Sequence, residues 1–232
     1  MCVAYYACTY YNKNDMFKLK DTHSKQAFIA ETSRVEAYSD AIIAIIMTLL
    51  VFNLKAPVLQ GLSATEDLRI VNNIWPQFLA FIVSFIALAV IWVNHHHFFH
   101  ALKGIDKKLL WHNNHILVWV CLVPFATALA GENFGNPTAT AVYGLVMLMM
   151  SVAFSLTIRH AFFYSVLLPD TVNKNEREKQ FRRSLIGPIA YVVGIFWSFF
   201  FPYISMIIYV LIMLFYFLPQ RIEDAVSDAV GA

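Results

Sequence analysis

Residues 34–54 read RVEAYSDAIIAIIMTLLVFNL, and this stretch decides the fold class of the chain. After Asp40 it holds no ionisable residue until Lys55, and Pro57 ends it because proline cannot continue a helix. A helix that spans a bilayer needs about 20 mostly apolar residues. The stretch therefore predicts a transmembrane helix whose apolar part is residues 38–54.

Working outward from this helix, the rest of the chain contains five more apolar runs. They cover residues 74–99, 109–130, 138–168, 185–201 and 203–218, with a charged loop predicted at 173–183. The chain is 59% hydrophobic and 14% charged, with a mean hydropathy of +0.59, whereas soluble domains carry about 25% charged residues. The sequence predicts an all-α integral membrane protein with six transmembrane helices in residues 32–220, between tails at 1–31 and 221–232.

Lysine and arginine are unevenly divided between the two sides of this predicted bundle. One side holds Lys13, Lys18, Lys20, Lys25 and Arg34, then Lys103, Lys107 and Lys108, then the basic residues from Arg159 to Arg183, and finally Arg221. The other side holds only Lys55 and Arg69. Because basic loops stay in the cytoplasm, we expect both termini and both tails to be cytoplasmic. Residues 1–30 show no signal-peptide pattern, so we expect a cell membrane, namely a bacterial inner membrane.

Polar residues inside the first three spans gather at one predicted depth, near the cytoplasmic surface. They are Arg34, Ser39 and Asp40, then Trp92 and the run Asn94 to His97, then Trp111 to His115. The layer is interpretable as a polar clamp between helices, as a proton-sensing or gating element, or as a metal site. The spacing favours the clamp. His96 and His100 only loosely resemble the boxes of di-metal enzymes, and consecutive histidines spread around a helix.

A stripe of apolar side chains follows on the first helix. Ile45, Leu49 and Phe52 share one helix face, and Thr48 borders it. The stripe is consistent with a pore that is narrowed by apolar rings and gates by dewetting, or with packing against a neighbouring helix. Spacing alone favours packing.

These residues carry a resemblance to a known family. Arg34 to Asp40 resembles the RxxxFSD signature of the endosomal and lysosomal potassium channel family, transmembrane protein 175, with Tyr38 in place of phenylalanine. Residues 92–96 resemble the end of that family's second helix, and residues 111–113 and 124–127 resemble its third. The resemblance covers residues 34–130.

The resemblance implies a homotetrameric potassium channel whose first helices surround the axis. It implies a constriction formed by Ile45, Leu49 and Phe52, with Thr48 contributing to selectivity. An aromatic residue at position 52 departs from the smaller aliphatic residues that are more usual there. It also implies a cytoplasmic polar network, with Asp40 paired to Arg34. The expected members of this network are Arg34, Ser39, Asp40, Trp92, Asn94, His95, His96 and Asn113.

Passive potassium conduction is the function that we expect. The expected partners are potassium ions, membrane lipid and further copies of the chain, without nucleic acid, cofactor, bound metal or enzymatic activity. Two alternatives remain at this point: a proton-coupled secondary transporter, and a membrane metalloenzyme that uses the histidine cluster. The sequence shows no TVGYG-like filter and no nucleotide-binding loop.

Overall fold

The computed structural model describes residues 32–58, 63–164, 167–168 and 172–217, and every regular element in these ranges is a helix. The predicted tails 1–31 and 221–232 lie outside the described residues. The elements are α2 (Thr32–Leu49), the 3₁₀ turn η1 (Leu50–Asn53), α3 (Ala64–Asn72), α4 (Trp75–His100), α5 (Lys107–Glu132), α6 (Pro137–Arg159), the π-helical turn η2 (His160–Tyr164), α7 (Lys174–Ser198) and α8 (Pro202–Phe217).

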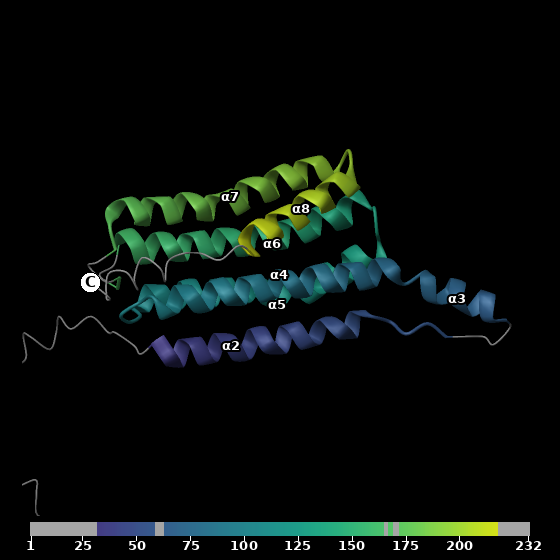
Figure 1. Cartoon of the computed structure of the whole chain (residues 1–232), viewed down its shortest axis with the longest axis horizontal. Coiled ribbons are helices and arrows are strands. Elements are labelled where there is room, and N and C mark those ends of the chain that lie inside the picture. Colours follow the sequence, from purple (N-terminus) through teal and green to yellow (C-terminus); the bar gives the residue numbers. More distant parts are fainter. Residues whose placement is uncertain (1–31, 59–62, 165–166, 169–171, 218–232) are drawn as a thin grey trace, which may run out of the picture.

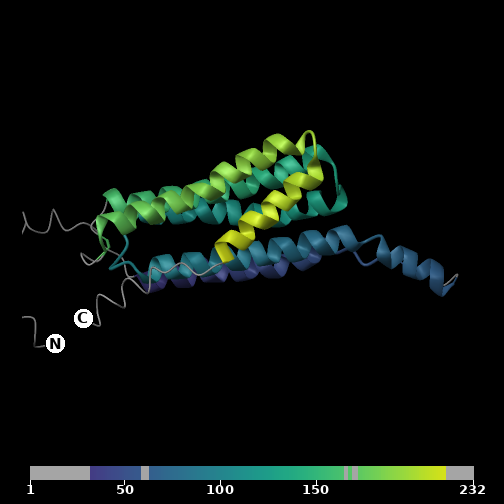
Figure 2. The same ribbon diagram turned by 45° about the horizontal axis from the view of Figure 1, so that its top comes forward.

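The long helices form an up-and-down bundle of two groups (Figures 1 and 2). The first group is α2, α4 and α5, and the second is α6, α7 and α8. The helix α6 packs against both α5 and α7, so it joins the groups. The shorter α8 leaves the end of α7 and slants toward α4 (Figure 2). The helix α2 begins at the same end of the bundle where α4 and α6 end and α7 begins (Figure 1).

Four stretches are long and apolar enough to cross a membrane: residues 32–53, 67–100, 107–132 and 137–164. Pro202–Phe217 is a shorter apolar helix. The chain is therefore a multi-pass, all-helical membrane protein. Each of the six predicted apolar runs coincides with a helix over most of its length, although the predicted run 138–168 continues past Tyr164 and 185–201 continues past Ser198. The count of six membrane crossings stays a prediction.

One local prediction is wrong, and one helix was missed. The charged segment 173–183 is no loop, because α7 already begins at Lys174. Ion pairs between successive turns accompany this helix, with Lys179 to Glu176 at 3.8 Å and Arg182 to Glu178 at 3.6 Å. The helix α3 was not predicted, since its nine residues are too few and too polar for a transmembrane helix.

Side chains at the helix starts explain several boundaries. Asp106 precedes α5 and accepts a hydrogen bond of 2.7 Å from the backbone N–H of Leu109. Asn136 caps α6 in the same way, with Pro137 at the first helical position. Gly135 turns the chain between α5 and α6 with a φ of 79°, a conformation that favours glycine.

Tyr209 of α8 fixes the second helix group. Its ring lies against Gly144 of α6 and Gly194 of α7, and a methyl group at either glycine would overlap it. The Tyr209 ring also contacts those of Tyr143 at 6.0 Å and Tyr191 at 5.5 Å. The two glycines thus form a notch for one aromatic side chain.

Candidate functional site

The helix α2 has two distinct faces. Val35, Ser39, Ile43, Ile46 and Leu50 are buried against the bundle, where α2 packs on α5 and α4. On the other face the predicted constriction residues are exposed, with Ile45 57%, Leu49 39% and Phe52 76% accessible. The same face carries Ala37, Ala41 and Ala44, which are also exposed. Among the residues that the structure describes, nothing in a single chain covers this apolar face.

Thr48 lies on the exposed face between Ile45 and Leu49. Its Oγ1 donates a hydrogen bond of 2.7 Å to the backbone carbonyl of Ile45. A hydroxyl has one proton and two lone pairs, so this bond uses the proton and leaves oxygen lone pairs to face outward. Such an oxygen is suited to contact a cation.

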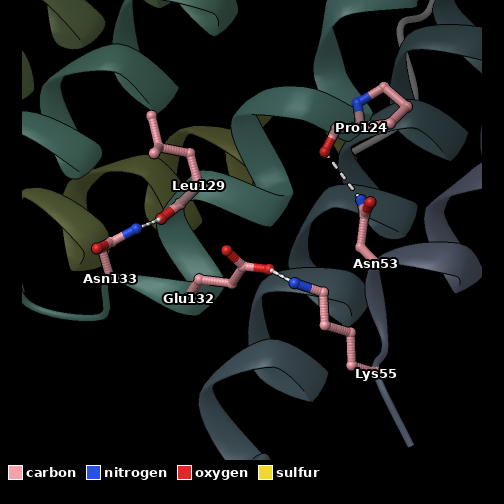
Figure 3. A network of polar contacts seen from close by, with 6 residues as sticks. All are labelled: Asn53, Lys55, Pro124, Leu129, Glu132 and Asn133. Atoms are coloured by element: carbon pink, nitrogen blue, oxygen red, sulfur yellow. Dashed lines mark hydrogen bonds and ion pairs between the residues drawn. The ribbon is translucent and has the colours of Figure 1, made fainter.

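Polar contacts fasten the far end of α2 to α5 (Figure 3). The Nδ2 of Asn53 donates to the Pro124 carbonyl at 2.8 Å, and the Nζ of Lys55 lies 2.5 Å from a carboxylate oxygen of Glu132. The η1 turn lies between Leu49 and these anchors. These two contacts hold the chain directly after Phe52.

A buried triad joins three helices toward the other end of α2. The Nδ2 of Asn113 on α5 donates to the Ser39 hydroxyl of α2 at 3.0 Å, and the Oδ1 of Asn113 lies 2.8 Å from Nε2 of His95 on α4. All three side chains are at most 1% exposed. Because the amide oxygen only accepts, Nε2 of His95 is the donor in this assignment. The triad matches the clamp interpretation for Ser39, His95 and Asn113.

A second contact lies on the surface beside the triad. The indole Nε1 of Trp92 donates to Asp40 at 2.9 Å, and the ring of His96 stacks on Trp92 with centroids 6.0 Å apart. The expected pair of Arg34 with Asp40 does not form among the described residues, because positions six apart lie on different faces of α2. Asp40 is paired with the indole instead.

Asn94 does not join either group. Its Nδ2 donates to the Val90 carbonyl at 2.8 Å and to the Tyr216 carbonyl at 3.4 Å, so it faces α8. Arg34 is exposed at the start of α2. The single predicted network is therefore two separate groups, without Arg34 and Asn94.

The structure also contains a buried polar cluster that was not predicted. The Oγ1 of Thr127 on α5 donates to Ser84 of α4 at 2.7 Å, and Ser84 lies 3.2 Å from the hydroxyl of Tyr143 on α6. Each residue is an isolated polar side chain in an apolar run. Thr127 lies in the stretch 124–127 that resembles the family's third helix, whereas isolation in an apolar run was the signal for Ser84 and Tyr143.

Asp106 forms a contact between the α4–α5 loop and the end of α6. One of its oxygens lies 2.8 Å from Nε2 of His160. Burial raises the pKa of Asp106, but hydrogen bonds from Leu109 and His160 outweigh it, so the pKa is below its usual value. The ring of His112 lies 5.4 Å from that of His160. Within the described ranges, no three His, Cys, Asp or Glu side chains are placed to hold one metal ion.

Comparisons with known proteins agree with the resemblance. The profile of the family described as endosomal/lysosomal potassium channel TMEM175 matches residues 34–124. A potassium channel of Chryseobacterium sp. (strain P1-3) is 36% identical over 199 residues, covering 84% of this chain and 97% of that protein. A potassium channel of Chamaesiphon minutus is 33% identical over 173 residues, covering 73% of this chain and 85% of that protein.

A solved structure shares the fold. The crystal structure of a lysosomal potassium-selective channel TMEM175 homolog from Chamaesiphon minutus superposes with a TM-score of 0.71 at 29% identity, covering 81% of this chain and 96% of that one. The resemblance predicted from residues 34–130 is thereby confirmed. The chain belongs to the family of the endosomal/lysosomal potassium channel TMEM175.

Proposed function

We propose that α2 lines the ion pathway of this potassium channel, in an assembly of four copies around a common axis. The chain is an ion channel and not an enzyme, as its relatives are channels. The observation that carries the proposal is the exposed face of α2, which holds Ile45, Leu49 and Phe52 beside Thr48.

Small residues distinguish this face from one that merely contacts lipid. Ala37, Ala41 and Ala44 form its first half, before the large side chains of Ile45, Leu49 and Phe52. Small side chains let helices approach closely inside membranes. Four copies of α2 could therefore pack near an axis, with rings of Ile45, Leu49 and Phe52 as the narrow parts.

Conduction in this arrangement is passive. Apolar rings close a pore by expelling water, and widening them lets a hydrated or partly hydrated potassium ion pass down its gradient. The outward lone pairs of Thr48 supply polar contact between the rings of Ile45 and Leu49. The triad of Ser39, His95 and Asn113 then fixes the rotation of α2 about its own axis, which decides which residues face the pore.

The orientation and the number of spans form part of the proposal. In the described residues, the basic groups near Arg34, Lys107 and Lys174 belong to helix ends that meet at one end of the bundle (Figure 1). The positive-inside rule assigns that end to the cytoplasm. We therefore propose six spans, cytoplasmic termini and a location in a bacterial cell membrane.

Flux through liposomes tests the pore assignment. Ile45→Asn should enlarge potassium flux and reduce the preference for potassium over sodium, because a polar ring holds water in the constriction. The matched control is Ile189→Asn on α7, since Ile189 is also an exposed isoleucine, at 63%. That variant should behave like the parent. If Ile45→Asn forms intact oligomers and conducts like the parent, α2 does not line the pore.

A further inference from the structure

Two histidines at the end of α4 share one exposed helix face. His96 and His100 are four residues apart, and both are exposed. Their rings are nearly parallel, with an interplanar angle of 15° and centroids 6.0 Å apart. The neighbouring rings differ: His95 is buried in the triad, and the ring of His97 is inclined by 73° to that of His96.

This arrangement has the chemistry of a metal chelate. Two histidines at i and i+4 on one helix face are the pair that holds zinc in metalloproteases. Imidazole suits zinc, copper and nickel, whereas magnesium and calcium prefer oxygen ligands. His100 also lies in the last turn of α4, where the helix dipole favours a positive charge.

We propose that His96 and His100 bind one divalent transition-metal ion of the zinc, nickel or copper class per chain. Water completes the coordination shell, so the ion exchanges readily and acts as a ligand, not as a permanent cofactor. The proposal departs from the absence of metal expected from the sequence. The consecutive residues His95, His96 and His97 do point in different directions around the helix, but His100, one turn later, lies on the same face as His96.

The site is connected to the proposed pore helix through one side chain. The His96 ring stacks on Trp92 at 6.0 Å with an interplanar angle of 24°, and Trp92 donates to Asp40 of α2. A metal ion that fixes His96 also restrains the indole against which it packs. Bound metal should therefore hinder movement of α2 relative to α4 and lower potassium flux. This second part rests on the proposed function.

Metal titration of the purified channel tests the site directly. The protein should carry an affinity tag without histidine, and binding of zinc or nickel is measured by calorimetry in detergent near pH 7.5, with magnesium as the negative probe. We expect one ion per chain, and at least tenfold weaker binding for His96→Ala and for His100→Ala. His97→Ala is the control, because it would lose affinity if any histidine of the run could bind the metal. It should bind zinc or nickel as tightly as the parent does.

Three results would overturn the site. They are no saturable binding by the parent, unchanged binding by His100→Ala, and an equal loss in His97→Ala. His100 is exposed at the helix end, so its replacement by alanine should not disturb folding. The variant should elute from a size-exclusion column at the same volume as the parent. His100→Cys, which restores a ligand, should recover zinc binding; a failure to recover it would show that His100 acts only through structure.

Flux measurements separate this inference from the proposed function. Zinc added on the side of His100 should slow potassium flux in the parent and leave His100→Ala unaffected. Intact binding with unaltered flux in the parent would refute the connection through Trp92. An absence of potassium flux in the metal-free parent would refute the pore proposal, while the calorimetric result would still decide the metal site.

Discussion

Replacing Asn113 by alanine removes the centre of the buried triad. Ser39 keeps its own bond of 2.9 Å to the Val35 carbonyl, so it still has a partner. His95 is affected more, because its Nδ1 already has no partner among the described residues and its Nε2 would lose the only one. A buried polar group without a partner costs about 1–3 kcal/mol.

Measurements on membrane proteins narrow the expected loss of stability. Hydrogen bonds between transmembrane helices contribute about 0.6 kcal/mol on average, with a maximum near 1.7. Two bonds and one unpaired imidazole nitrogen then give a loss of about 2 kcal/mol in the free energy of unfolding. The assay is denaturation in mixed micelles, followed by tryptophan fluorescence, for the parent and Asn113→Ala.

The adjacent residue supplies the control. Asn114 has the same side chain but is exposed, so Asn114→Ala should change the free energy of unfolding by less than about 0.5 kcal/mol. If Asn113→Ala loses no more stability than Asn114→Ala, the triad does not hold the three helices together, and the argument from burial is wrong.

Three further perturbations follow from contacts described above. Gly144→Ala places a methyl group on Tyr209 and should cost about 1–3 kcal/mol in the same assay; a neutral effect would contradict the notch. Because the pKa of Asp106 is lowered on folding, its ionised form stabilises the protein at higher pH, and this stabilisation is lost below about pH 4. Unfolding midpoints from pH 7 to pH 3 should fall less for Asp106→Asn than for the parent, and parallel profiles would count against this assignment. Phe52→Ala should raise potassium flux through liposomes with little change in stability, since Phe52 is 76% exposed; unchanged flux would remove Phe52 from the constriction.

The helices themselves were predictable from apolar runs, because length and hydropathy depend only on sequence. The start of α7 was not predictable in this way, since residues 173–183 hold many charges and a hydropathy pattern does not reveal a polar helix that lies outside the membrane. The ion pairs at three- and four-residue spacing, such as Arg182 with Glu178, were the available signal.

The polar network was predictable in composition but not in connectivity. Successive residues of a helix point about 100° apart, so the choice between Asn94 and His95 as partner of Asn113 depends on the rotation of α4. That rotation is set by packing in the whole bundle, which no local pattern reveals. The same reason explains why Asp40 meets Trp92 of another helix and not Arg34 of its own.

The η1 turn gives the chain a way to redirect one side chain through a small change of helix winding. A 3₁₀ turn has three residues per turn, so Leu49 and Phe52 lie in line along the axis. Rewinding residues 50–52 into α-helix would rotate Phe52 by about 60° and shorten the segment by about 1.5 Å. A change of winding over a single turn, with Asn53 still anchored to Pro124, would therefore swing the aromatic ring away from the line of Leu49.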